Sequence, residues 1–283
     1  MSALSVIPRL GLRVKFGRVQ ARLLARTCVN VPASSAIVSF TFDDFTKSAA
    51  TIAQEGLEAR GWHATYFASA GYCASTTHLG RMFEPEDIRR LSDAGHEIGC
   101  HTHTHLNVSQ EDISAVEADV ALNATKLEEM GLRAKLSVFA FPYGESTPAH
   151  KRALIKRFHA LRGVTPGVNR GISDRALLRA VGVHGNALQI EEAVHLALEV
   201  GRKGGWLIFY AHDIQEMPSP WGCDPASFKR VLDAVSASGA EVLPLGQTVD
   251  RLLRWERDCM HEAQEQGRCP PEGDQPAVCD RTG

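Results

Sequence analysis

The sequence predicts an α/β fold with parallel strands in one large domain. Short apolar runs alternate with longer segments of helical periodicity from residue 36 to about residue 250, an order typical of strands joined by crossover helices. No change in composition marks a second domain in that range. Four of the apolar runs end in polar or ionisable residues. Because all strands of a parallel barrel open their carboxyl ends on one rim, we expect those residues to converge.

Local signals place the elements of the first half of the chain. Three helices are expected, each closed by a glycine, because glycine readily adopts the left-handed conformation that ends many helices. They span 48–60, 84–94 and 110–130. Apolar runs rich in β-branched and aromatic residues predict buried strands. These strands span 36–42, 63–68 and 97–100.

The second half of the chain repeats the same alternation. Apolar runs predict strands at 136–141, 206–210 and 241–245. Segments of helical periodicity predict helices at 149–158, 189–203 and 225–238. The evenly spaced glycines between residues 163 and 171 are interpreted as turns.

The two ends of the chain differ from this middle part. We divide the chain into a basic amphipathic segment (1–33), an α/β barrel (34–250) and a polar, disordered tail (251–283). The first thirty residues carry six basic residues and no acid. Their apolar residues Leu12, Phe16, Val19 and Leu23 share one helical stripe. We expect that stripe to dock on the protein's own core; the alternative is peripheral contact of residues 1–30 with an anionic membrane.

Charge and cysteine content narrow the setting. The chain holds 31 Lys and Arg against 33 Asp and Glu, so no overall charge favours nucleic acid as a partner. The seven cysteines fit reduced thiols better than a disulfide framework. Cys259, Cys269 and Cys279 recur too widely for a zinc knuckle and are expected to be free. With no apolar run of signal-peptide length, we expect a cytoplasmic protein, with peripheral contact at the inner face of the membrane as the alternative.

The ionisable residues at the strand ends include the side chains that ligate metals. His101 and His105 are four apart, so a helical turn after the strand would point both imidazoles the same way, as two ligands of one metal require. The pair Asp43 and Asp44 offers a carboxylate that completes a His/His/carboxylate set, although an Asp pair after a strand is also a common helix cap. His212 follows another predicted strand. Motifs for serine hydrolases, nucleotide hydrolases and dinucleotide binding are absent from the sequence.

Four motifs in order resemble the polysaccharide deacetylases of the NodB-homology type, carbohydrate esterase family 4. The matched region covers residues 35–249. The four motifs are Thr-Phe-Asp-Asp at 41–44, His-Thr-His-Thr-His at 101–105, Phe-Pro-Tyr-Gly at 141–144 and Leu-Ile-Phe-Tyr-Ala-His at 207–212. The resemblance implies a distorted (β/α) barrel and removal of N-acetyl groups from a saccharide.

The resemblance also implies roles for individual residues. Asp43 is the general base. The metal ligands are Asp44, His101 and His105, with zinc the expected ion. The backbone N–H of Tyr143 helps hold the oxyanion. His212 is the general acid, and Leu207 lines the pocket for the acetyl methyl group.

Two departures from the family pattern qualify these roles. Ala140 stands where better-known members carry an arginine that pairs with the catalytic aspartate. Either Arg162 or Arg170 replaces that arginine, or the role of Asp43 is weakened. The motif that orients the catalytic histidine is also unmatched, and Asp174 and Asp213 are the candidates for that duty. The alternatives that remain open are a related metal amidase acting on a non-sugar amide and a non-catalytic carbohydrate-binding member.

Overall fold

A curled parallel sheet forms the centre of the molecule. The computed structural model of the chain describes residues 12–265. Seven parallel strands follow the order β10-β11-β2-β3-β6-β7-β8, so the predicted α/β class is confirmed. Their bounds are β2 Ala36–Asp43, β3 Thr65–Ala68, β6 Glu97–Cys100, β7 Val138–Ala140, β8 Ala160–Arg162, β10 Val181–Gly182 and β11 Gly205–Ala211.

Three further pairings complete the strand set. Strand β12 (Glu241–Val242) pairs with the amino-terminal part of β2. Strands β1 (Cys28–Val31) and β9 (Gly171–Asp174) form a separate antiparallel pair, as do β4 (Thr76–Thr77) and β5 (Gly80–Arg81). A bridge joins Leu178 to Arg162 at the end of β8, and β10 follows soon after against β11. The segment from 178 to 182 therefore spans the two edges of the sheet and brings it close to a barrel.

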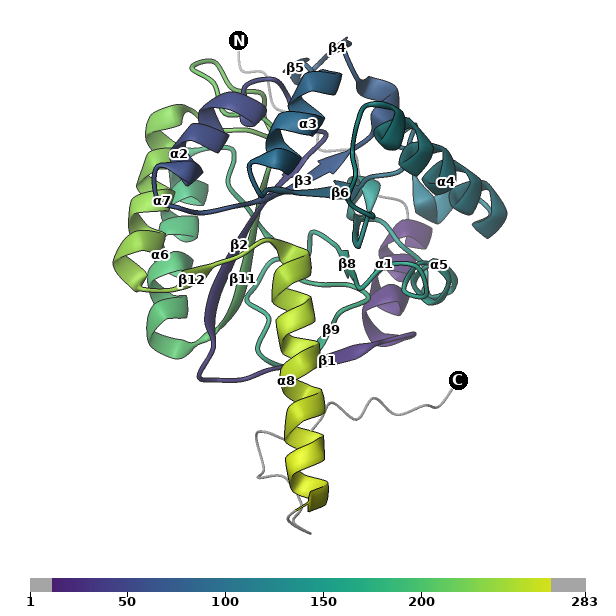
Figure 1. Cartoon of the computed structure of the whole chain (residues 1–283), viewed down its shortest axis with the longest axis vertical. Coiled ribbons are helices and arrows are strands. Elements are labelled where there is room, and N and C mark those ends of the chain that lie inside the picture. Colours follow the sequence, from purple (N-terminus) through teal and green to yellow (C-terminus); the bar gives the residue numbers. More distant parts are fainter. Residues whose placement is uncertain (1–11, 266–283) are drawn as a thin grey trace.

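Helices surround the sheet, as Figure 1 shows. They are α1 Leu12–Leu23, α2 Gln54–Glu58, α3 Pro85–Asp93, α4 Ile113–Glu129, α5 Pro148–Leu154, α6 Ala187–Lys203, α7 Pro225–Ser238 and α8 Leu245–Glu265. A π-helical turn, Ala49–Ala53, precedes α2, and short 3-10 turns lie at Ala70–Tyr72, Val108–Gln110 and Pro142–Gly144. Local sequence fixes the ends: Asn186 and Gln189 form a capping box at the start of α6, and Gly204 ends it at a φ of 68°.

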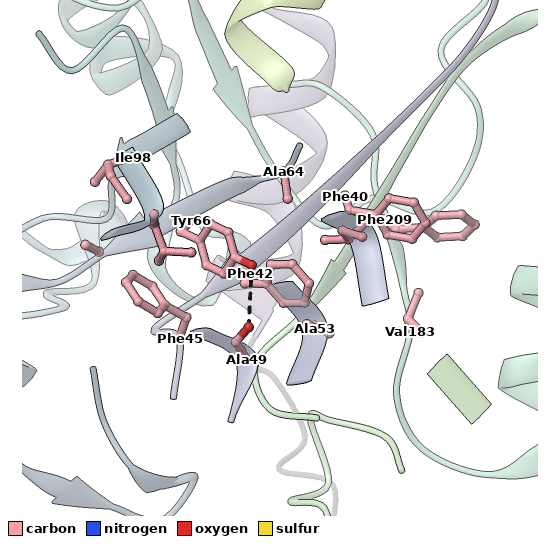
Figure 2. Packing of buried hydrophobic residues seen from close by; sticks show 14 of the residues in the cluster. Phe40, Phe42, Phe45, Ala49, Ala53, Ala64, Tyr66, Ile98, Val183 and Phe209 are labelled. Carbon is pink, nitrogen blue, oxygen red and sulfur yellow. Dashed lines mark hydrogen bonds between the residues drawn. The ribbon is translucent and has the colours of Figure 1, made fainter. Parts of the chain in front are cut away.

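Aromatic side chains fill the space between the sheet and its helices (Figure 2). Phe42 stacks on Tyr66 with ring centroids 4.9 Å apart, and Phe45 meets the same ring edge-on at 5.1 Å. The hydroxyl of Tyr66 is satisfied by donating to the Ala49 carbonyl at 3.4 Å. This packing is fully buried and holds the carboxyl end of β2, from which the site begins, in a fixed place.

The structure differs from two sequence expectations near the ends of the chain. Helix α8 continues to Glu265, so the predicted disordered tail is helical up to that residue. Figure 1 shows α8 extending away from the rest of the molecule. On α1, Val19 and Leu23 are 49% and 69% exposed, so the expected docking of their stripe on the core is wrong for these two residues. The side chains of Leu12 and Phe16 lie outside the described part of the structure. Residues 1–11 and 266–283 lie outside it altogether.

A different contact holds α1 to the protein. Ala21 is buried, and Lys151 of α5 donates to the carbonyls of Ala21 and Leu24 at 2.6 and 3.0 Å. The same ammonium pairs with Asp174 at 2.6 Å. Because the last carbonyls of a helix lack partners within it, this buried lysine satisfies the end of α1 and fixes its position.

Cysteines and membrane segments give further outcomes. Cys73, Cys100 and Cys223 are free thiols, as expected, whereas Cys28 is disulfide-bonded, which corrects the expectation for that residue. Cys269 and Cys279 lie outside the described residues. Within the described part of the chain, every helix is too short or too polar to cross a bilayer.

Candidate active site

The parallel register brings the predicted site residues to one level of the sheet. Strand β11 pairs Ala211 with Phe42, so His212 and Asp43 follow side by side. Strand β6 pairs Cys100 with Phe139, which sets His101 beside Ala140. The expected convergence at the carboxyl ends of the strands is therefore what the pairing produces.

Asp44, His101 and His105 form a group that could hold a metal ion. One ligand atom of each residue lies within 4.8 Å of the others. The Asp44 Oδ2 atom is 2.9 Å from His105 Nε2 and 3.8 Å from His101 Nε2. Two imidazoles and one carboxylate are the ligand set of many catalytic zinc sites, which keep a further position for water or substrate.

Neighbouring groups orient these ligands as a metal would require. The Nδ1 atom of His101 lies 2.8 Å from the Ala140 carbonyl, an acceptor that fixes the proton on Nδ1 and leaves the lone pair on Nε2. The Ser69 hydroxyl donates to Asp44 Oδ1 at 2.8 Å and leaves Oδ2 for the ligand set. The donor set and its supporting hydrogen bonds thus fit a divalent cation.

Electrostatics keep the ligands in their metal-binding protonation states. Burial acts to raise the pKa of Asp44, but the neighbouring imidazoles of His101 and His105 outweigh it and lower the pKa to about 2. Burial lowers the pKa of His101 to about 4, against the opposing effect of Asp44 and Asp43. Asp44 is therefore ionised and His101 neutral at pH 7, as metal ligation requires.

The backbone reaches this arrangement through strained positions rather than a helix. The segment after β6 is not helical, which corrects the expected helical turn: Thr102 and His105 have φ values of 61° and 53°. Asp44 and Tyr143 also have positive φ, at 41° and 58°. Non-glycine residues in this region cost about 1–3 kcal/mol each and concentrate at functional sites.

Asp43, the expected base, is buried against an arginine. Its side chain is 5% exposed and pairs with Arg162, whose side chain is fully buried. Burial acts to raise the pKa of Asp43, but the charge of Arg162, with smaller effects from His101 and His212, holds the pKa below its usual value. The guanidinium also lies over the rings of Phe67 and Tyr210, 5.3 Å from each centroid. Arg162 is thus the cation beside Asp43, one of the two expected replacements.

The position of Arg162 explains why residue 140 can be an alanine rather than an arginine. Strands β7 and β8 pair Ala140 directly with Arg162. Paired residues of neighbouring parallel strands share a face of the sheet, so the arginine reaches Asp43 from one strand further along. Arg170, the other candidate, donates instead to the Gly204 carbonyl and to Glu199.

His212 and Tyr143 border the same group. Tyr143 packs against His105 with ring centroids 4.5 Å apart, and its side chain is 59% exposed. The turn after β7 is closed by hydrogen bonds from Gly144 to Phe141 and from Glu145 to Pro142. Among the described residues, the Tyr143 N–H has no backbone or side-chain acceptor outside its own short helical turn, so it is available to a ligand.

Known proteins with this architecture were found by sequence and by structure. A family model described as polysaccharide deacetylase matches residues 30–159. This part of the chain is therefore similar to the polysaccharide deacetylase family. A comparison with curated proteins gives no match.

Solved structures share the fold over most of the chain. The Xyl-CE4 domain of a multidomain xylanase from the hindgut metagenome of Trinervitermes trinervoides is 14% identical, with a TM-score of 0.54 over 84% of this chain and 94% of that chain. The chitin deacetylase of Colletotrichum lindemuthianum is 16% identical, with a TM-score of 0.57 over 77% and 89%. A family 4 carbohydrate esterase pseudoenzyme from Bacillus anthracis is 14% identical, with a TM-score of 0.53 over 77% and 66%. At these identities the likeness shows the fold.

The deacetylase match ends before two of the residues that complete the site. Arg162 and His212 lie beyond residue 159 and are placed by the structure. The His212 Nδ1 atom lies 3.3 Å from the Trp221 carbonyl oxygen, so a backbone acceptor orients this imidazole.

The two carboxylates considered for that duty serve elsewhere. Asp174 accepts from Thr27 and Lys151. Asp213 accepts from the Ser219 backbone N–H at 2.8 Å, and the Ser219 hydroxyl in turn accepts from the Trp221 N–H at 3.1 Å. Asp213 therefore braces the loop that carries the Trp221 carbonyl, and its carboxylate bonds to Gln215 and Ser219 rather than to the His212 ring.

Residues before His212 differ from the expected pocket lining. Leu207 is fully buried in the core and pairs with Val38 in the middle of β11. Tyr210, two residues before His212, is the partly exposed residue of this strand. The sequence indicates that Tyr210 lies on the same face as His212, since side chains two positions apart share a strand face.

Proposed function

We propose that this protein is a metal-dependent hydrolase that removes N-acetyl or related acyl groups from the amino sugars of a poly- or oligosaccharide or a glycan precursor, releasing acetate. The observation that carries the proposal is the adjacency of two units. One is the potential metal-binding group Asp44, His101 and His105. The other is the buried pair of Asp43 and Arg162 beside it.

Asp43 is suited to act as the general base. Arg162 keeps its pKa low, so the carboxylate is ionised and able to accept a proton from water at neutral pH. A divalent cation held by Asp44, His101 and His105, which we propose to be zinc, supplies the Lewis acidity that acidifies water and polarises a carbonyl.

His212 and Tyr143 are suited to the two remaining tasks. The Trp221 carbonyl holds the His212 ring at Nδ1 and leaves Nε2 to donate a proton to the departing amine. The Tyr143 N–H lies in a turn beside His105, where a backbone donor can stabilise the tetrahedral oxyanion. Amines are poor leaving groups without a proton, so turnover requires Asp43 to be ionised and His212 to be protonated.

Exposed aromatic rings support a saccharide as the substrate. Tyr143 is 59% exposed and Trp221 48% exposed, and each borders a proposed catalytic residue. Such rings present an apolar face with a polar tip, which suits the face of a sugar ring. Two of the structurally similar proteins are a chitin deacetylase and the Xyl-CE4 domain of a multidomain xylanase, which supports this class.

Release of acetate from N-acetylated oligosaccharides tests the proposal. We expect wild-type protein to release acetate, and a chelator or Asp44→Ala to abolish release. Asp43→Asn should retain bound metal but lose turnover, because the amide cannot accept the proton. Acetate release that survives both the chelator and Asp44→Ala would contradict the metal mechanism, and a fully active Asp43→Asn protein would contradict the assignment of the base.

The second candidate is a non-catalytic carbohydrate-binding member. The structural similarity to a pseudoenzyme favours it, but Arg162 supplies the cation whose absence at Ala140 was its main argument. Metal binding and saccharide binding without release of any acyl group would support this reading. A related amidase acting on non-sugar amides would instead hydrolyse acylated amines that lack a sugar.

The cytoplasmic location stays a prediction. Disulfides persist mainly in oxidising compartments, so the redox state of Cys28 in cells tests this prediction. Cell fractionation with thiol trapping distinguishes the two: Cys28 should be alkylated at once if the protein is cytoplasmic, and protected if it is not.

A further inference from the structure

A cavity lies between α1 and the segment from residue 165 to 179. Its volume is about 450 Å³, within the range of small-molecule sites. Four arginines line it: Arg22, Arg26, Arg170 and Arg179. The proposed catalytic residues do not line this cavity, which we call the basic pocket.

The charge of the basic pocket is not offset by its own acid. Asp174 is the acidic residue among its described lining. Its Oδ2 atom pairs with buried Lys151 at 2.6 Å, and its Oδ1 atom accepts from the Thr27 and Ala176 N–H groups at 2.9 and 3.0 Å. Because the carboxylate is already fully paired, the arginines set the potential in the pocket.

Three of the arginines are held in place by backbone carbonyls. Arg26 donates to Ile172, Arg170 to Gly204 and Arg179 to Pro166, at 3.0–3.3 Å. A guanidinium has five N–H donors, so each keeps donors for a ligand, although Arg170 also pairs with Glu199. Such forks match the oxygens of a phosphate group.

Exposed apolar side chains surround the mouth of the pocket. Leu23 and Ile172 line it and are 69% and 50% exposed. Val19, one helical turn before Leu23 on the same face of α1, is 49% exposed, and Leu24 is 51% exposed. A free soluble anion would leave these side chains in water, whereas the interface of a bilayer offers both phosphate groups and an apolar layer.

We propose that the basic pocket binds the phosphate group of an anionic membrane lipid and docks this face of the protein on the membrane surface. The arginines engage the headgroup while Leu23 and its neighbours enter the interface. Charge complementarity and the adjoining apolar surface both favour this occupant.

The docking face lies away from the candidate active site. Arg170 is bound to Gly204, immediately before β11, whereas His212 immediately follows that strand. Seven residues of strand separate the two by roughly 20 Å. The proposed activity on a soluble saccharide is therefore independent of lipid binding.

Co-sedimentation of the full chain with vesicles tests the proposal. We expect binding to phosphatidylcholine vesicles that contain phosphatidylglycerol and weak binding to phosphatidylcholine alone. Each arginine removed should weaken binding about fivefold, so Arg22→Gln with Arg179→Gln should weaken it about 25-fold. Arg133→Gln, an exposed arginine outside the pocket, is the matched control and should bind as wild type.

Three results would overturn the proposal. Equal binding to both vesicle types would remove the role of the anionic headgroup. Unchanged binding by the double variant would remove the role of the pocket. Absence of vesicle binding, together with binding of free pyrophosphate that the double variant loses, would assign the pocket to a soluble phosphate compound instead.

Discussion

Replacing Arg162 with methionine tests the most distinctive feature of the site. Methionine fills much of the space of the arginine stem but carries no charge, so Asp43 would stay buried without its cation. The two side chains are 0% and 5% exposed. Removing one partner of such a buried pair costs about 3–5 kcal/mol, a large part of the roughly 5–15 kcal/mol that stabilises a typical domain.

The same substitution should change the acidity of Asp43. Arg162 holds the pKa of Asp43 below its usual value, so loss of the pair should raise the pKa of this buried carboxyl. The base would then be protonated in the acid range, where the wild-type carboxylate is ionised. We expect the acidic limb of the kcat/KM profile of Arg162→Met to move to higher pH than in the wild type.

Acetate release measured across pH, with bound metal quantified at each point, provides the assay. Arg230→Met is the matched control, because Arg230 pairs with Glu191 on the surface. The double variant Ala140→Arg with Arg162→Met places the cation on the neighbouring strand at the paired position and should recover part of the lost activity. An Arg162→Met protein with the wild-type pH profile and stability would refute the role of this pair.

Three other changes give separate tests. Ser69→Ala removes the donor to Asp44 and should weaken metal affinity about 10–100-fold, measured by competition with a chelator; unchanged affinity would contradict the orienting role. Lys151→Met should destabilise the protein by about 3–5 kcal/mol in urea unfolding, because it leaves Asp174 and the end of α1 unpaired; a loss below 1 kcal/mol would show that the anchor is dispensable. Burial lowers the pKa of His96 by more than Glu58 raises it. The folded protein therefore binds this proton less readily than the unfolded chain does. The free energy of unfolding should fall as the pH drops from about 6.5 through the folded-state pKa, by at most about 1.4 kcal/mol per pH unit. His96→Asn should flatten that dependence in urea unfolding at pH 7 and pH 5, and an identical slope would contradict it.

The position of the site could be predicted because it depends on strand order. Apolar runs that the sequence marks clearly end at four of the site residues, Asp43, Asp44, His101 and His212. Parallel pairing of the strands then places these residues at the same edge of the sheet. The route that brings His105 to His101 could not be predicted, since it depends on left-handed backbone at Thr102 and His105, which the surrounding structure imposes.

Arg162 shows a different limit of sequence reasoning. It was one of two candidate cations, but β8 spans only three residues and carries too little periodicity to be expected as a strand. Only the pairing of Ala140 with Arg162 separates it from Arg170. The apolar stripe of α1 was misplaced for a similar reason, because periodicity identifies an apolar face but not what covers it.

Metal content and acetate release measured together test the central claim most directly. Protein stripped of metal is titrated with zinc, and the rate of acetate release from an N-acetylated oligosaccharide is followed against zinc bound per chain. The account predicts a rate that rises in proportion to bound zinc and levels off at one ion per chain, with Asp44→Ala neither binding tightly nor turning over. A rate that is independent of bound metal would contradict it.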